Sequence, residues 1–139
     1  MIIYHLSTTH STFPQVTMYC GEEPLELSRA AAGTLALLTS DVEISKRVIE
    51  FNSTLDILKY LILNEDLEVR HRGLYIVANM ISGEKDVAEK LLEDKELFDV
   101  LLAYDVTDSG SELCKQALDR AILGAKKWNI IQDNPVVAQ

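Results

Sequence analysis

The chain has 139 residues, of which 47% are hydrophobic and 25% charged, and its formal net charge is −9. This length suits one domain with a core of its own, and the negative charge disfavours nucleic acid as a partner, because phosphate binding needs a concentrated basic surface. No run of about 18 uncharged apolar residues occurs, so we expect no membrane-spanning helix and no membrane partner. The two cysteines, Cys20 and Cys114, form no paired framework or metal motif, which suits a reducing compartment such as the cytoplasm.

Residues 1–21 differ in composition from the rest, because they contain no Lys, Arg, Asp or Glu and many Ser and Thr. They lack the positive start and the apolar run of a signal peptide. We interpret them as a poorly ordered leader, or as one short strand or turn. His5, His10 and Cys20 could suggest a metal, but their spacing matches no ligand pattern, which favours solvated tail residues.

Beyond the leader, apolar residues recur at helical spacing, and segments repeat at a nearly constant interval. Residues 25–40 align with residues 67–82 at a shift of 42, and residues 55–63 align with residues 97–105 at the same shift. A third copy, residues 111–127, follows at a further shift of about 44. A period in the low forties is typical of armadillo and HEAT solenoids. We therefore expect an all-α fold, an armadillo-like α-α superhelix (solenoid) of about three repeats.

The predicted solenoid has an interior and two ends. Its interior is expected to contain apolar residues from all the repeats, namely Leu35, Leu38, Leu58, Leu61, Leu74, Val77, Ile81, Leu101 and Leu118. Each repeat leaves an apolar face for its neighbour, so the helix over residues 25–39 has a bare side unless residues 1–21 cover it. We expect self-association or low solubility because of that side, whereas the third copy forms a C-terminal cap.

Turn residues fall between the predicted helices. The side-chain oxygens of Asn52, Ser53 and Thr54 are expected to cap the helix that follows them, by accepting its exposed backbone N–H groups. Gly83 is expected to end the central helix, because glycine tolerates the left-handed conformation found there. Residues 108–111 separate the second copy from the third.

The predicted helix over residues 67–82 has three faces. Two adjoining faces are apolar, as expected for a helix packed between neighbours, and Gly73 is expected to let another helix approach closely. The third face carries residues at i, i+4, i+7 and i+11, which share one side of a helix: Glu68, Arg72, Tyr75 and Asn79. The matching face of the third copy carries Glu112, Gln116 and Asp119.

These polar faces allow two interpretations, a solvated helix surface or a concave groove that binds an extended polypeptide. In the second interpretation, Asn79 bonds main-chain amides of the client and Tyr75 packs beside them. A glutamate begins the face in each copy, at Glu26, Glu68 and Glu112, which favours a client segment that carries Lys or Arg.

The basic cluster at the start of the central helix does not predict catalysis. Arg70 and Arg72 lie at different angles around the helix, so they cannot form one phosphate cradle, and Arg72 can pair with Glu68. His71 has no nucleophile or acidic partner nearby in sequence, so we interpret it as a packing or capping residue. The sequence contains no phosphate-loop, dinucleotide, zinc-protease or nucleophile-elbow motif. We expect no enzyme, and no catalytic residue, cofactor or metal.

Three phrases, RAAAGTLALLT, VRHRGLYIVANMISGEKDVAEKLLE and ALDRAILGAKKWNII, resemble the C-terminal end of the UCS domain. That domain belongs to the animal myosin chaperones of the uncoordinated (Unc) type, relatives of the fungal Cro and She proteins. The resemblance divides the chain into the leader 1–21, an armadillo-like C-terminal UCS segment over 22–132, and a tail over 133–139. In armadillo proteins an aromatic residue followed four residues later by asparagine marks the peptide groove, and Tyr75 and Asn79 have this spacing.

The resemblance implies a cytosolic chaperone that binds the motor domain of the myosin heavy chain and assists its folding and assembly. In the animal family an N-terminal tetratricopeptide domain recruits the ninety-kilodalton heat-shock chaperone. That domain is missing from this sequence, so we expect a fragment of the full protein that meets this chaperone only through the absent domain. The alternative is a generic armadillo scaffold for protein interactions without folding activity.

Overall fold

The computed structural model describes residues 12–20, 25–104 and 112–132, and within them the chain forms α-helices and no strand. The helices are α2 (Thr12–Tyr19), α3 (Leu25–Leu38), α4 (Val42–Ile49), α5 (Thr54–Ile62), α6 (Leu67–Gly83), α7 (Lys85–Glu93), α8 (Lys95–Leu102) and α9 (Glu112–Lys127). The predicted all-α fold is confirmed.

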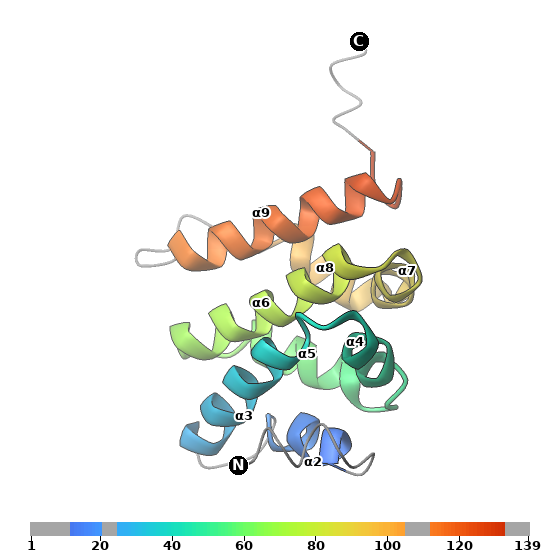
Figure 1. Ribbon diagram of the computed structural model, residues 1–139. Helices are drawn as coiled ribbons and strands as arrows, with labels where there is room; N and C mark the ends of the chain where they lie inside the picture. Colours follow the sequence, from blue (N-terminus) through green and yellow to red (C-terminus); the bar gives the residue numbers. More distant parts are fainter. Residues whose placement is uncertain (1–11, 21–24, 105–111, 133–139) are drawn as a thin grey trace.

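The long helices α3, α6 and α9 lie one above another, with the shorter pairs α4/α5 and α7/α8 between them along the chain (Figure 1). The order short, short, long therefore occurs twice, as α4–α5–α6 and as α7–α8–α9, and α3 supplies the preceding long helix. Helix α6 packs on α3 on one side and on α9 on the other. This is the solenoid stacking that the repeat predicts.

The interior follows the predicted apolar pattern. All the residues predicted for it are buried, and Leu35, Leu58, Leu61, Leu74 and Val77 have no exposed surface. Helix α6 contributes most, because both of its apolar faces are covered. The prediction that α6 is packed between neighbours is confirmed.

Acidic side chains cap several helices. Asp41 accepts the amides of Glu43 and Ile44 at the start of α4, and Asp94 accepts the Leu97 amide at the start of α8. The predicted cap of α5 is wrong, since the Ser53 side chain makes no such bond. The buried Thr54 hydroxyl instead donates to the Val48 carbonyl at 2.6 Å, because a buried hydroxyl needs an acceptor and the last turn of α4 supplies one.

The ends of α6 and α9 differ from each other. The left-handed ending predicted at Gly83 is wrong, because the chain leaves α6 through Glu84, which is extended with φ −157° and ψ 142°. The left-handed residue is Asn129, with φ 62°, and there the Ile130 amide donates to the Ala125 carbonyl at 2.9 Å. Helix α9 therefore ends in a Schellman motif, a common way to satisfy the last carbonyls of a helix.

The segment predicted to be a poorly ordered leader or a short strand contains helix α2 (Thr12–Tyr19). Val16, Thr17 and Cys20 are buried, and the Ser28 hydroxyl of α3 donates to the Cys20 carbonyl. Helix α2 packs on α3, α4 and α5, so it covers part of the α3 side that was expected to be bare. This cover removes the reason for expecting self-association through a bare side of α3. Self-association stays a prediction.

Several expectations fall on residues that the structure does not describe. They concern residues 1–11, including His5 and His10, the separator at 108–111, and the tail at 133–139. The domain boundaries drawn through these segments stay predictions.

Gly73 sets how closely α5 approaches α6. A Cβ atom at Gly73 would lie 2.7 Å from the Leu61 Cβ and 3.3 Å from the Ile62 amide nitrogen. We expect Gly73→Ala to lower the free energy of unfolding by about 1–3 kcal/mol, because overpacking outweighs the gain of about 1 kcal/mol in helix propensity. Urea unfolding measures this change.

The matched control is Gly83→Ala on the same helix, where the nearest heavy atom to an added Cβ, the Val42 Cγ2, lies 3.5 Å away. This control should leave stability unchanged or slightly raised. Equal effects of the two substitutions would contradict the packing argument.

Candidate protein-binding surface

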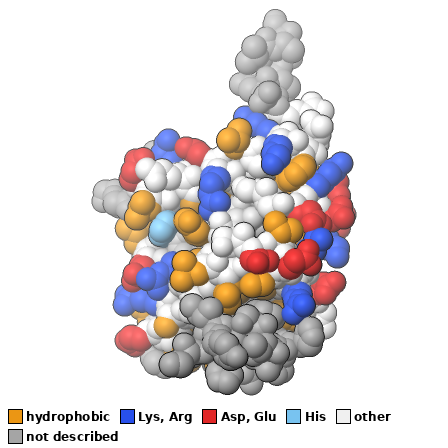
Figure 2. Space-filling model, viewed as in Figure 1, with side chains coloured by type: hydrophobic (Ala, Val, Ile, Leu, Met, Phe, Trp, Pro, Cys, Tyr) orange, Lys and Arg blue, Asp and Glu red, His pale blue; other side chains and the backbone are white. Residues whose placement is uncertain are grey.

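A groove of about 700 Å³ lies on the face formed by α3, α6 and the start of α9. Its walls combine apolar, aromatic and charged side chains: Gly33, Ala36, Leu37, Leu67, Glu68, His71, Arg72, Tyr75, Leu113 and Cys114. Figure 2 shows this face, on which hydrophobic side chains lie between groups of both charges. Three of the predicted site residues, Glu68, Arg72 and Tyr75, line the groove.

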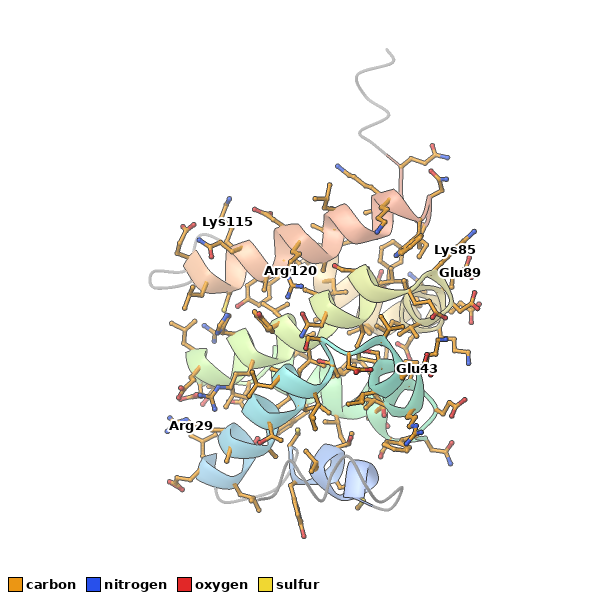
Figure 3. The ribbon with its side chains drawn as sticks, viewed as in Figure 1. Arg29, Glu43, Lys85, Glu89, Lys115 and Arg120 are labelled. Carbon is orange, nitrogen blue, oxygen red and sulfur yellow. The ribbon has the colours of Figure 1, made fainter. Side chains whose placement is uncertain are left out.

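Tyr75 stands at the centre of this surface with 41% of its area exposed. The His71 ring meets it edge to face, with ring centroids 5.9 Å apart. From α9, the Arg120 guanidinium carbon lies 4.7 Å from the Tyr75 ring centroid, and the side chain extends from α9 toward α6 (Figure 3). These contacts hold the ring in place while one side stays accessible.

His71 belongs to this packing. Burial lowers the pKa of its imidazole, the neighbouring Arg72 lowers it further, and Glu68 partly opposes both. A neutral ring against Tyr75 agrees with the predicted packing role.

Arg120 was missed in the sequence analysis, which followed positions spaced like those on α6. Arg120 directly follows Asp119, the last residue named on the predicted face of α9. Only the packing of α9 on α6 places its guanidinium over Tyr75.

The predicted exposure of Asn79 is wrong. Its side chain is 8% exposed, and its amide nitrogen donates to the Ala36 carbonyl at 2.8 Å and to the Thr39 hydroxyl at 3.3 Å. Ala36 lies in the last turn of α3, where helix carbonyls have no backbone partner within the helix, and Thr39 directly follows that helix. Asn79 therefore joins two stacked units and is not free to bond the main chain of a client.

The α3 and α6 charges form a connected cluster beside the groove. Arg72 pairs with Glu68 at 2.9 Å, as predicted, and also donates to the Arg29 carbonyl at 2.5 Å. Arg29 pairs with Asp66 at 2.7 Å, and Asp66 in turn caps α6 by accepting the Val69 amide at 3.0 Å. The hydrogen bond from Arg29, assisted by that amide, holds the pKa of Asp66 below its ordinary value.

The predicted residues on α9 are exposed but do not line the groove. Asp119 pairs with Lys115 at 3.2 Å, and Glu112 and Gln116 face solvent. Lys115 points away from α6 (Figure 3). The groove instead contacts α9 through Leu113 and Cys114. The predicted polar face thus divides between the groove, on α6, and the outer surface of α9.

Exposed apolar side chains extend this surface along the stack. Leu37 on α3 is 67% exposed, and Leu113 and Leu123 on α9 are also exposed. Leu37 and Leu123 occupy the repeat positions that correspond to Asn79. Together with Tyr75 they offer apolar area that a bound polypeptide could cover.

Among the described residues, no group of three or more His, Cys, Asp or Glu side chains is arranged to hold a metal ion. In that same part of the chain, no helix combines the length and apolar character needed to cross a bilayer.

Known proteins share both the sequence and the fold. Over 85 residues the chain is 48% identical to protein unc-45 homolog B of Xenopus laevis, which covers 59% of this chain and 9% of that relative. Over 111 residues it is 37% identical to protein unc-45 homolog B of Danio rerio, covering 76% of this chain and 11% of the relative. No family model matches the chain.

The solved structure of UNC-45 from Drosophila melanogaster superposes with a TM-score of 0.76 and 29% sequence identity, over 86% of this chain and 15% of that one. The chain is therefore homologous to UNC-45 homolog B over about 60–76% of its length and has the helical solenoid fold of UNC-45. The resemblance inferred from the sequence is confirmed. The chain spans about a tenth of the length of the curated relatives it matches.

We expect Asn79→Ala to lower the free energy of unfolding by about 1–3 kcal/mol, because the Ala36 carbonyl and the Thr39 hydroxyl lose a buried donor. A thermal melt with urea unfolding measures the change. Gln116→Ala is the matched control, since it removes an exposed amide and should stay within about 0.5 kcal/mol of wild type. A melt of Asn79→Ala that equals wild type would mean that the amide does not join the units.

We expect the stability advantage of wild type over Asp66→Asn to depend on pH. Asparagine caps helices about as well as aspartate, so the substitution removes chiefly the charge. A folded-state pKa below the ordinary 3.8 gives stabilisation that is present above 3.8 and is lost as pH falls through the lower folded value. Urea unfolding from neutral to acidic pH should show the difference shrinking below that point. A difference that stays constant on acidification would exclude the Arg29–Asp66 pair as its source.

Proposed function

We propose that this chain binds a client polypeptide, the myosin motor domain, through the groove between α3, α6 and α9, and assists its folding and assembly. The observation that carries the proposal is the exposed apolar surface of Leu37, Tyr75 and Leu113 around a groove of about 700 Å³. Homology to UNC-45 homolog B supports it, because the UCS resemblance implies a myosin chaperone.

The groove has the chemistry expected for a partly unfolded segment. Apolar and aromatic side chains can cover exposed apolar residues of a client without requiring one sequence. The exposed carboxylates of Glu26, Glu68 and Glu112 favour a segment that carries Lys or Arg. Arg72 and Arg120 limit this preference, because each places a positive charge beside Tyr75.

Further features of the proposal follow from the same resemblance. We assign contact with the ninety-kilodalton heat-shock chaperone to a tetratricopeptide domain outside this segment, and the cytoplasm as the compartment. We assign the chain a binding role without enzymatic activity. A generic armadillo scaffold remains the second candidate, favoured by the fact that solenoid faces bind partners without folding them.

Suppression of thermal aggregation of a myosin motor fragment separates the two candidates. A chaperone should keep the heated fragment in solution at near-equal molar ratio, measured by light scattering. A chain that binds the native motor but leaves its aggregation unchanged is a scaffold. Absence of both binding and suppression would overturn the proposal.

We expect Leu37→Ala combined with Tyr75→Ala to weaken motor binding by about 1–3 kcal/mol, the range for truncated interface anchors. The melting temperature should change less than for Asn79→Ala, because Leu37 is 67% exposed and Tyr75 keeps 41% of its area in water, whereas Asn79 is buried. A titration by fluorescence anisotropy measures the affinity, which should also fall with added salt.

The matched control is Met18→Ala, which truncates an exposed apolar side chain on α2, away from the groove. It should leave motor binding unchanged. Equal losses for this control and for the groove variant would show that the groove is not the binding site.

A further inference from the structure

Arg120 brings to the edge of the client groove a positive charge that no carboxylate balances. Its guanidinium carbon lies 4.7 Å from the ring centroid of Tyr75, which lines the groove. One of its nitrogens lies 3.5 Å from the Tyr75 carbonyl oxygen, which is longer than a typical hydrogen bond. Among the described residues, no ion pair joins Arg120 to an Asp or Glu. This free cation stands out in a chain whose net charge is −9.

The charged side chains that line the groove already have partners. Glu68 and Arg72 pair with each other at 2.9 Å. Glu68 also lies 3.5 Å from the Arg29 guanidinium, and Arg72 donates to the Arg29 carbonyl at 2.5 Å. A Cβ at Gly33 would lie 3.1 Å from the Arg72 guanidinium, so that side chain is closely packed. Burial keeps the pKa of His71, the remaining basic side chain of the lining, below its ordinary value, so its ring is largely neutral at neutral pH.

The contact with Tyr75 positions the Arg120 guanidinium and leaves most of its hydrogen-bond donors free. A guanidinium has five N–H donors in a planar fork, and a cation–π contact uses none of them as a conventional hydrogen bond. The Tyr75 carbonyl accepts one at most. The side chain is partly exposed and extends from α9 toward α6 (Figure 3). A group bound on Tyr75 therefore has beside it a guanidinium suited to a carboxylate.

We propose that this groove selects client segments in which an apolar residue lies next to an Asp or Glu, and that Arg120 binds the side-chain carboxylate. The inference rests on the proposed client-binding function and names the class of segment that the same site accepts. The apolar side chain of the client covers Tyr75 and Leu37, and the neighbouring carboxylate pairs with Arg120. Arg120 is thus a specificity-determining residue.

Arg120 lies away from the glutamates that favour a basic client residue. Glu26, Glu68 and Glu112 occupy the first turns of α3, α6 and α9. Arg120 follows Glu112 by about two helical turns, or roughly 12 Å along the axis of α9. The preference for Lys or Arg and the preference for Asp or Glu therefore concern different places on this face.

The test uses three labelled peptides that differ only in the two residues flanking a central Leu-Phe pair, which are both Glu, both Gln or both Lys. Each is blocked at both ends, so only side chains carry charge, and has about ten residues, or roughly 33 Å when extended. Fluorescence anisotropy should show wild type binding the Glu peptide about three- to tenfold more tightly than the Gln peptide, and the Lys peptide most weakly. Because the net charge of −9 repels acidic peptides, overall charge cannot produce this order.

Arg120→Met removes the charge and keeps a long side chain beside Tyr75. It should abolish the preference for the Glu peptide over the Gln peptide and leave binding of the Gln peptide nearly unchanged. Arg120→Glu should reverse the order, so that the Lys peptide binds more tightly than the Glu peptide. Circular dichroism confirms that each variant is folded, and the peptide order with wild type tests the proposal without any variant.

Lys115→Met is the matched control, since it makes the same change in net charge on the same helix with a side chain that points away from α6 (Figure 3). Its exposed pair with Asp119 contributes little to stability. This control should keep the wild-type preference. Leu37→Ala should weaken binding of all three peptides alike, because it removes apolar contact area from the groove itself.

The possible failures of this proposal and of the client groove differ. Equal affinity of wild type for the Glu and Gln peptides would overturn the role of Arg120 and leave the client groove in place. Tighter binding of the Lys peptide, or equal effects of Arg120→Met and Lys115→Met, would do the same. Absence of binding to all three peptides, or affinities that Leu37→Ala leaves unchanged, would overturn both.

Discussion

The burial of α6 on two sides is the constraint on which the rest of the structure depends. Helix α6 contacts α3 and α9, and it also packs on α5 and α7. Such contact requires apolar residues around most of the helix, and Val69, Leu74, Ile76 and Val77 are fully buried. It also requires a small residue where α5 passes, since a Cβ at Gly73 would meet the Leu61 side chain at 2.7 Å. The short helices and their caps are arranged around this central layer.

The same stacking decides which polar side chains remain available for binding. A stacked helix buries the carbonyls at the end of its neighbour, and these need donors. Asn79 donates to the Ala36 carbonyl and Trp128 donates to the Ile81 carbonyl at 2.7 Å, so both serve contacts between long helices. The exposed surface is left to Tyr75, Leu37 and the charged cluster around Arg72. Such a groove therefore offers a client apolar contact area rather than hydrogen bonds to its main chain.

Because the chain is homologous to UNC-45, the description of this surface also bears on related proteins. The fold of UNC-45 recurs here over most of the chain, which itself corresponds to about a tenth of its relatives' length. A solenoid segment has two long faces, and here both carry exposed leucines, Leu37 on one and Leu63 on the other.

The amino-acid sequence alone determined the helical class, the repeat and the interior. Helical periodicity and a period in the low forties can both be read from the order of residues, without coordinates. It also determined the Glu68–Arg72 pair, which depends only on spacing along one helix. The tertiary structure alone decided the fate of Asn79, the place of Arg120 over Tyr75 and the cover that α2 gives to α3. Each of these depends on contacts between residues far apart in sequence, as the separation of Asn79 from Ala36 illustrates. A periodic pattern states which side of a helix a residue occupies, whereas only the packed neighbour decides whether that side faces water or another helix.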